Sequence, residues 1–569
     1  MRRSREISRY LLMVAVLGIM ALSAGATAPA NEAERYMQIK ENIGLFGTVY
    51  REISSKYVDD IDPEAFVRAG INGMLGSLDP YTTFLDNDQA DDLHIMTAGQ
   101  YGGVGIEIGI RGRDKILTVI SPIEGTPAQR VGIRPGDRII DIDGHSTFGF
   151  TTDQAATLLR GQPGSKVDIL VERIGVSEPI SFTLERAMIT VRDVTFSGIL
   201  SDGVGYIKLA RFSRNAGEEV RAALRGLQAQ GMTRLVFDLR RNPGGLLPSA
   251  VEVAQCFVPK EVEIVRTQGR DAESRRSYVS QVDPVCDDVP MVVLVDEGSA
   301  SASEIVAGAL QDLDRAVIIG KTTFGKGLVQ TLVEFREGQA LKITTARYFT
   351  PSGRLIQKLD YFDQRDPVVV YLSEPQDTTA ERERFFTKAG RVVYGGGGIT
   401  PDLEVSLPDI DQYETEMIRE GLFYEFCAAY LSQHPGWREN NIADAILMGF
   451  KQFLAEKGFN YQGDLEEKMQ DLLVVAEDDS NIPPELQQEL LALQGKLIAT
   501  RQDYFQQHLS FIQDGLKREF AGLADGNRGR ILAGLEDDAQ MQTALKLLGD
   551  DKELRTLLRG PEQALEKSK

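Results

Sequence analysis

Apolar residues recur along this chain at two spacings, and the spacing changes from one block of sequence to the next. Between residues 35 and 96 they lie three to four positions apart, which predicts helices. Between residues 100 and 184 alternating runs such as Arg138–Ile142 predict strands separated by glycine-containing turns. From about residue 408 to the end, the helical spacing returns.

The block from residue 189 to residue 350 alternates strand patterns with helix patterns. We expect strands at 204–212, 234–240, 291–295 and 316–320, and helices around 220–227 and 302–313. Strands and helices in β-α-β order predict a largely parallel sheet covered by helices, so this block should be an α/β core.

A chain of 569 residues is too long for one core, so we expect a multidomain protein. The pattern changes place a leader at 1–28, N-terminal helices at 31–97, a strand-rich domain at 98–184, the α/β core at 189–407 and an all-helical region at 408–569.

The helical region contains an amphipathic stretch that predicts either one long helix or a hairpin. Its apolar positions are Leu486, Leu490, Leu493, Leu497, Phe505, Leu509, Ile512 and Leu516. We favour packing of this stretch on its own neighbours. A surface for a second copy or for an adaptor protein is the alternative.

The first residues resemble a targeting segment. Four arginines precede an apolar run from Leu11 to Leu22, and small residues of the A-x-A type follow. The run is shorter than the roughly 20 residues of a membrane-spanning helix, so we expect a cleaved signal peptide and a periplasmic or otherwise extracytoplasmic protein. An uncleaved anchor that tethers the protein to the membrane is the alternative.

Charge and composition exclude several classes of function. A net charge of −21 repels phosphate backbones, so we expect no nucleic-acid partner. Four histidines offer little material for a histidine-based metal site, and we expect neither a metal nor an organic cofactor. Cys256, Cys286 and Cys427 are too few for a disulfide framework and should be buried as small apolar residues.

The segment 121–144, SPIEGTPAQRVGIRPGDRIIDIDG, resembles part of a PDZ domain. The resemblance implies that the loop from Tyr101 to Ile106 holds a peptide carboxylate. Backbone N–H groups beside glycines can bind an anion, and the next strand offers a free edge to an added peptide strand. The loop residues are Tyr101, Gly102, Gly103, Val104, Gly105 and Ile106. A plain tight turn is the alternative.

Three serines alternate after the apolar run 291–295, at positions 299, 301 and 303. Ser301 and Glu304 match the S-x-x-E capping box, which would explain Ser301 as a helix cap alone. The same position suits a nucleophile, because the free N–H groups and the positive end of a helix dipole stabilise an oxyanion. It also follows the carboxyl end of a strand, where chemistry collects in open α/β sheets.

A serine nucleophile needs a proton acceptor. None of the four histidines lies in a motif. Lys326, between Gly325 and Gly327 and one β-α-β unit after Ser301, is better placed. Burial among apolar neighbours such as Phe324 would lower its pKa from the ordinary value of about 10.4. An exposed turn lysine is the alternative.

Three motifs in this order resemble the carboxyl-terminal processing peptidases, also called tail-specific proteases. They are GSASASEI at 298–305, TFGKG at 323–327 with Gln330, and DLRRNPGG at 238–245. The resemblance covers about residues 36–407. It implies a crotonase-like α/β protease core with an inserted PDZ domain, and a serine endopeptidase that recognises protein C-termini.

The resemblance also implies roles for individual residues. Ser301 would be the nucleophile, Lys326 the general base and Gln330 the residue that orients the lysine. The oxyanion donors would be the N–H of Ala302 and that of either Gly244 or Gly245. The substrates would be proteins or peptides with free apolar C-termini.

Three other functions deserve comparison with this one. A scaffold of the same fold would bind C-terminal peptides without cutting them, but it would not need Ser301, Lys326 and Gln330. A trypsin-like protease joined to a PDZ domain would need His and Asp partners and a G-x-S-G-G-like loop, whereas residues 298–303 read GSASAS. A crotonase would need a coenzyme A site, and the sequence contains no recognisable one.

Overall fold

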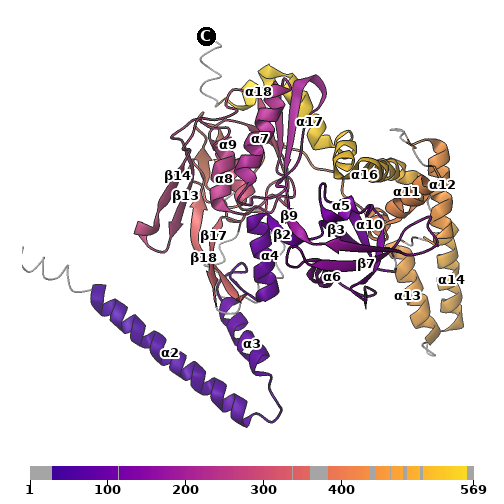
Figure 1. Cartoon of the computed structure of the whole chain (residues 1–569), viewed down its shortest axis with the longest axis horizontal. Coiled ribbons are helices and arrows are strands. Elements are labelled where there is room, and N and C mark those ends of the chain that lie inside the picture. Colours follow the sequence, from indigo (N-terminus) through magenta and orange to yellow (C-terminus); the bar gives the residue numbers. More distant parts are fainter. Residues whose placement is uncertain are drawn as a thin grey trace, which may run out of the picture. The chain divides into compact units, whose positions relative to one another are not determined.

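The chain divides into two units, Met1–Phe84 and Leu85–Lys569. The computed structural model describes residues 28–112, 114–335, 338–358, 382–434, 437, 442–459, 461, 463–478, 483–499 and 504–559 (Figure 1). The leader predicted at 1–28 lies outside the described residues except for Ala28. None of the helices in the described part of the chain is both long and apolar enough to cross a membrane.

The first unit consists mainly of α2 (Ala28–Lys56) and α3 (Pro63–Leu75), and β1 (Thr83–Leu85) begins at its end. Asp62 starts α3 by accepting hydrogen bonds from the N–H groups of Glu64 and Ala65. The rings of Tyr50 and Phe66 stack at 5.6 Å between the two helices. Most of the periodic apolar side chains nevertheless remain exposed, Ile43 by 67%.

The α/β core predicted for residues 189–407 contains a sheet with the order β10-β11-β12-β15-β16-β21. All neighbours pair in parallel except β10 and β11. The bounds are β10 (Val194–Ile199), β11 (Val204–Leu209), β12 (Arg234–Asp238), β15 (Met291–Val295), β16 (Val317–Gly320) and β21 (Leu403–Glu404). The expected parallel α/β fold is therefore confirmed.

Alternate residues of these strands enter two different layers of core. Leu235 and Phe237 of β12 pack with α7 (Ala216–Ala229), α8 (Leu247–Ala254) and α9 (Ala302–Asp312). Val236 points to the other face, where α17 (Ala539–Gly549) and α18 (Asp551–Leu557) cover it. The helices α17 and α18 thus complete the core of this central sheet (Figure 1).

A second, antiparallel sheet borders the core. It joins β17 (Leu328–Glu334), β18 (Ala340–Phe349), β13 (Glu263–Gly269) and β14 (Arg276–Val279) in that order. A separate hairpin follows, formed by β19 (Arg384–Phe386) and β20 (Val392–Tyr394).

The PDZ-like domain follows α4 (Asn87–Ala98). A two-stranded antiparallel ribbon of β2 (Gln100–Gly103) and β9 (Ala187–Thr190) forms its entry and exit. Its sheet has the order β3-β4-β5-β7-β8, so β3 lies at an edge. The strands are β3 (Ile106–Arg111), β4 (Ile116–Pro122), β5 (Arg138–Ile142), β6 (His145–Ser146), β7 (Lys166–Glu172) and β8 (Ile180–Glu185). The helices are α5 (Pro127–Arg130) and α6 (Thr152–Leu159).

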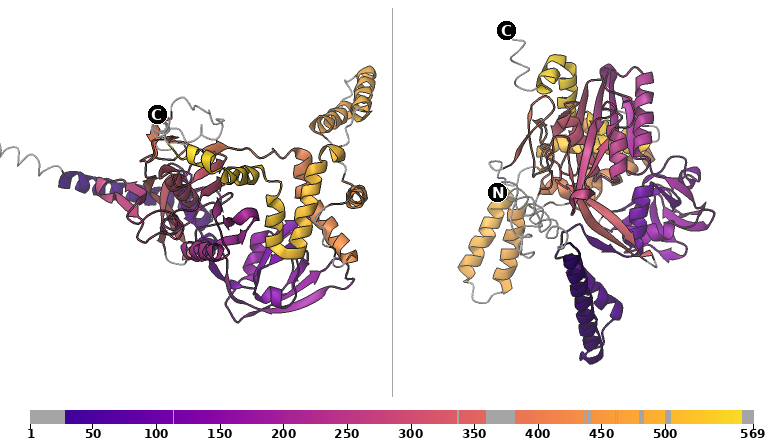
Figure 2. Two further views of the ribbon diagram at one scale, coloured as in Figure 1. Left: turned by 90° about the horizontal axis from the view of Figure 1, so that it is seen from above. Right: turned by 90° about the vertical axis from the view of Figure 1, so that its left-hand side faces the viewer.

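The C-terminal region is helical, as its spacing predicts. Its further helices are α10 (Gln412–Arg419), α11 (Leu422–Gln433), α12 (Asp444–Glu456), α13 (Asp464–Asp478), α14 (Pro484–Ala499), α15 (Tyr504–Gln507) and α16 (Leu509–Leu535). The amphipathic stretch is divided among α14, α15 and α16. Its second half is buried at Ile512 and Leu516, whereas Leu486 and Leu493 are exposed on α14, which packs beside α13 (Figure 2).

One buried carboxyl group lies where the chain passes from β9 to β10. Asp193 is fully buried, and its Oδ2 accepts a hydrogen bond of 2.5 Å from the hydroxyl of Ser213. Burial raises the pKa of Asp193 from 3.8 to about 6, although the Ser213 hydroxyl opposes this shift. The native state therefore holds this proton more tightly than the unfolded chain does.

We predict that Asp193 makes the stability of the protein depend on pH in one direction. The stabilisation by its proton is complete below about pH 4 and is lost as the pH rises through about 6. The thermal midpoint of Asp193→Asn, measured relative to the unmodified protein, should therefore increase between about pH 4 and about pH 7. The exposed Asp202→Asn should show no such change, and a flat difference for Asp193→Asn would contradict the prediction.

Candidate active site

Ser301 lies directly before the first turn of α9, in the loop that follows β15 and its apolar run 291–295. Its backbone has φ 53° and ψ −111°, a combination that costs energy for any residue with a side chain. Its side chain is half-buried, while every residue of α9 is buried. A strained residue at the start of a buried helix is typical of functional positions.

The two flanking serines are structural. Both are fully buried. The hydroxyl of Ser299 donates to the carbonyl oxygen of Leu239 at 2.8 Å, and that of Ser303 donates to the carbonyl oxygen of Asn242 at 2.8 Å. These bonds hold the loop of residues 299–303 against the DLRRNPGG segment. Ser301 is the most accessible of the three serines.

Glu304 is the centre of the hydrogen-bond network around Ser301. It is fully buried, and its Oε1 accepts from the hydroxyl of Thr323 at 2.6 Å and from the N–H of Gly325 at 2.7 Å. Its Oε2 accepts from the N–H of Ser301 at 2.8 Å and from that of Lys326 at 2.9 Å. The amide nitrogens of Ser301 and Lys326 are therefore no more than about 5.7 Å apart.

The protonation of Glu304 follows from this environment. The pKa of this carboxyl group is raised from its ordinary value, because the effect of burial outweighs the opposing hydrogen bonds from Thr323 and from the three amides. The carboxylate part of the S-x-x-E motif thus organises the site, beyond its role as a helix cap.

Tyr348 of β18 ties the same two residues together on the carbonyl side. Its hydroxyl lies 3.0 Å from the carbonyl oxygen of Ser301 and also contacts that of Lys326. The backbone of residue 301 and that of residue 326 are consequently held together twice, once through their N–H groups and once through their carbonyl groups.

The side chain of Lys326 is oriented by Gln330. Its Nζ donates to Oε1 of Gln330 at 2.9 Å. The pairing of β17 with β18 shifts register between Val329 and Gln330, so Gln330 lies at an irregular point of the ladder. Phe324, expected as an apolar neighbour of the lysine, is itself 45% exposed. Lys326 itself is half-buried.

The glycines of the DLRRNPGG segment lie against Ser301. A Cβ atom at Gly244 would come within 2.8 Å of the nitrogen of Ala302 and within 2.9 Å of the Cβ of Ser301. Gly244 is buried, and its N–H already donates to Oδ1 of Asn242 at 2.9 Å. Gly245 is exposed, and neither its N–H nor that of Ala302 has an acceptor among the residues that the structure describes.

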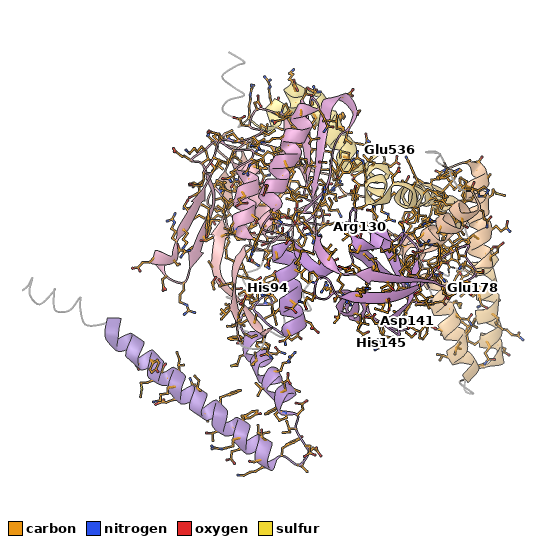
Figure 3. All side chains as sticks on the ribbon, viewed as in Figure 1. His94, Arg130, Asp141, His145, Glu178 and Glu536 are labelled. Carbon is orange, nitrogen blue, oxygen red and sulfur yellow. The ribbon has the colours of Figure 1, made fainter. Side chains whose placement is uncertain are left out.

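All four histidines have partners outside this network. His94 on α4 pairs with Glu334, and His145 in the PDZ-like domain contacts the carbonyl oxygen of Ile142 (Figure 3). The ring of His434 stacks on Tyr430, and His508 pairs with Asp411. Of the proton acceptors that the sequence analysis considered for Ser301, Lys326 is the one that belongs to this network.

Among the residues that the structure describes, one group of side chains in the C-terminal helical region has the composition of a metal site. Ligand atoms of Asp411, Glu414 and His508 lie within 4.8 Å of one another. Asp411 is also the N-cap of α10 and forms a capping box with Glu414. The pairing of Asp411 with Glu414 therefore has a structural explanation as a helix cap.

The predicted carboxylate loop is shorter than its six residues. Gly102 and Gly103 belong to β2 and pair with β9, and a Cβ at Gly102 would lie 2.2 Å from the carbonyl oxygen of Gly161. Their lack of side chains thus permits close packing of the ribbon. Only Val104 and Gly105 form the turn before β3.

The backbone of this turn leaves donors available. The carbonyl oxygens of Val104 and Gly105 accept bonds from Ala128 and Ile123. Their N–H groups have no acceptor in the described part of the chain. Tyr101 of β2 lies under the guanidinium of Arg160, at 5.6 Å from its ring centre, and Ile106 begins the edge strand β3.

Comparison with known proteins agrees with this architecture. Residues 203–361 match Peptidase family S41, 118–173 match the PDZ domain, 413–548 match the C-terminal helical domain of probable PDZ-proteases, and 15–89 match the activating protease CtpB N-terminal domain. The chain is 37% identical over 357 residues to a carboxy-terminal-processing protease of Bartonella bacilliformis, covering 62% of this chain and 80% of that protein.

Two further matches are another curated protein and a solved structure. The chain is 41% identical over 295 residues to a carboxyl-terminal-processing protease of Synechocystis, covering 51% of this chain and 68% of that protein. A solved photosystem II D1 C-terminal processing protease is 31% identical, with a TM-score of 0.34, covering 63% of this chain and 86% of that one. The chain belongs to the carboxyl-terminal processing peptidases of family S41, and it is a serine-type protease with a PDZ domain.

We predict that Glu304→Gln strongly destabilises the protein. A glutamine offers one acceptor oxygen and would turn its NH₂ group towards two of the four donors, which should cost about 3 kcal/mol of unfolding free energy. Chemical denaturation measures the loss. The control is Glu297→Gln, on the same loop, because 64% of the Glu297 side chain is exposed and its pair with Lys321 should contribute little. Equal stabilities of the two variants would contradict the prediction.

Proposed function

We propose that this protein is an exported endopeptidase that recognises the C-termini of proteins through its PDZ domain and cuts them with a Ser301–Lys326 dyad. The observation that carries the dyad is the double tie between residues 301 and 326 through Glu304 and Tyr348. Export is inferred from the arginine-rich apolar leader at 1–28.

In this proposal the neutral amine of Lys326 takes the hydroxyl proton of Ser301 as the serine oxygen attacks the scissile carbonyl. Gln330 accepts a hydrogen bond from one N–H of the amine, which orients the lone pair towards the serine. The resulting ammonium then protonates the leaving amine, and an acyl-enzyme remains on Ser301. Water releases the acyl group by the same steps in reverse order.

We assign the oxyanion donors to the N–H groups of Ala302 and Gly245. Both lack an acceptor among the described residues, whereas the N–H of Gly244 is engaged by Asn242. The absence of a side chain at Gly244 keeps the space beside the Ala302 nitrogen open for the substrate oxygen. The dipole of α9 adds positive potential at the same point.

Substrate recognition would use the edge of the PDZ sheet. The N–H groups of Val104 and Gly105 would bind the terminal carboxylate, and the apolar tail would add a strand to β3. The relatives' names, which refer to carboxyl-terminal processing, support this substrate class. A non-cutting peptide scaffold is the alternative, and the strained Ser301 with its network argues against it.

Ser301→Ala and Lys326→Ala should each abolish cleavage of a protein with an apolar tail, without loss of folding. Mass spectrometry of the products measures cleavage, and circular dichroism measures folding. The matched control is Ser303→Ala, which removes one buried hydrogen bond, should cost about 1 kcal/mol of stability, and should keep the activity. Undiminished cleavage by Ser301→Ala would exclude the assigned nucleophile.

Gly105→Ala should weaken the binding of a C-terminal peptide at least about tenfold, because any Cβ at this turn distorts the donors. Gly105 has φ +77°, and its Cβ would lie 2.4 Å from Thr126. Gly125→Ala is the matched control, since it has φ +75° with nothing within 4 Å. Fluorescence anisotropy measures the affinity, and equal binding of the amidated peptide by the unmodified protein would contradict carboxylate recognition.

A further inference from the structure

Arg240 lies in the segment that leads to the glycines beside Ser301, and only 8% of it is exposed. Its guanidinium is held from two sides. Nη2 donates to Oδ2 of Asp238, two residues before it, at 2.7 Å. Nη1 donates to Oδ2 of Asp538 at 2.5 Å and to Oε1 of Gln540 at 3.0 Å, and both residues belong to the C-terminal region.

Asp538 and Gln540 are themselves firmly fixed. Oδ1 of Asp538 accepts from the N–H groups of Gln540 and Met541 at 3.0 Å and thereby starts α17. The side-chain Nε2 of Gln540 donates to the carbonyl oxygen of Val405 at 2.8 Å. The helix α17 packs on β15 and β16 of the catalytic sheet. The acceptors for Arg240 therefore stand on a rigid element.

The charges in this group favour a permanent ion pair. Burial of Asp238 raises its pKa, but the charges of Arg240 and Lys208 outweigh this effect and hold the pKa well below its usual range. The pKa of Arg240 is raised, because Asp238 and Asp538 outweigh the effect of its burial. Arg240 thus keeps its charge, and its N–H groups donate to the carboxylates of both Asp238 and Asp538.

The backbone next to Arg240 is continuous with the glycine loop. The carbonyl oxygen of Leu239 accepts from the N–H of Asn242 at 3.2 Å and from the hydroxyl of Ser299 at 2.8 Å. Asn242 in turn holds the N–H of Gly244 and accepts from the N–H of Ala300. A displacement of Arg240 would therefore move the loop that carries Gly245.

We propose that Asp538, assisted by Gln540, is a positioning residue for the loop that carries Gly245. It acts by holding Arg240 in place, so the C-terminal helical region supports the geometry of the oxyanion site. The proposal rests on the proposed function, in which Gly245 donates to the oxyanion. Asp538 lies outside the peptidase match at 203–361 and inside the helical-domain match at 413–548.

The test is Asp538→Asn in the full-length protein. Asparagine keeps the oxygen that caps α17, but it turns an NH₂ group towards Arg240, where donor faces donor. We expect kcat to fall by about tenfold or more with KM unchanged, because small misplacements of catalytic groups cost up to about 10²-fold in rate. Labelling of Ser301 by a fluorophosphonate, which also needs the oxyanion site, should slow in parallel.

Asp550→Asn is the matched control. Asp550 starts α18 in the same way, by accepting from the N–H groups of Lys552 and Glu553 at 3.0 Å, and none of the described arginines bonds to its side chain. This variant should keep both kcat and the labelling rate. A kcat and labelling rate of Asp538→Asn equal to those of the unmodified protein, or a change in KM alone, would overturn the proposal.

A second variant decides the matter if Asp538→Asn does not fold. Gln540→Met removes one acceptor of Arg240 and leaves the Asp538 cap in place. A fall in its kcat at constant KM supports the proposal, and an unchanged kcat overturns it. All rates are taken as the part that Ser301→Ala abolishes. Cleavage that survives Ser301→Ala refutes the proposed function, whereas Ser301-dependent cleavage that is indifferent to residues 538 and 540 refutes only this inference.

Discussion

The buried carboxylate of Glu304 is the interaction on which the rest of the site depends. Taking a carboxylate out of water costs several kcal/mol, and hydrogen-bond donors must offset that cost. Four donors do so here, and two of them are the N–H groups of Ser301 and Lys326. The protein therefore cannot supply hydrogen bonds to both oxygens of this buried carboxyl group without also bringing the two residues together.

The surrounding layers reinforce the same arrangement. Buried hydroxyls of Ser299 and Ser303 join the serine loop to the glycine segment, and Tyr348 joins it to the lysine loop from the opposite side. Each of these bonds connects segments that are far apart in sequence, so the site forms only when the α/β core is complete. The C-terminal helices take part in that completion because they cover one face of the central sheet.

Local patterns predicted much of this molecule. The strand 291–295 and the helix after it appear where the apolar spacing places them, because both elements are buried and their periodicity is strong. The S-x-x-E motif identified Ser301 and Glu304, but only as a helix start. Spacing alone could not show that Glu304 also reaches the lysine loop, since that contact crosses from one β-α-β unit to the next strand. No local signal pointed to Tyr348.

The sequence by itself determined the order of the domains, the types of the main elements and the three motifs that mark the family. It could not distinguish Gly244 from Gly245, nor assign Gly102 and Gly103 to a ribbon. The first distinction depends on which N–H group already has a partner, and only the folded loop shows that the Asn242 side chain accepts from Gly244. The second depends on pairing with the distant strand β9. It also could not show that Ile43 stays exposed, because periodicity records which face of a helix is apolar and contains no information about what covers that face.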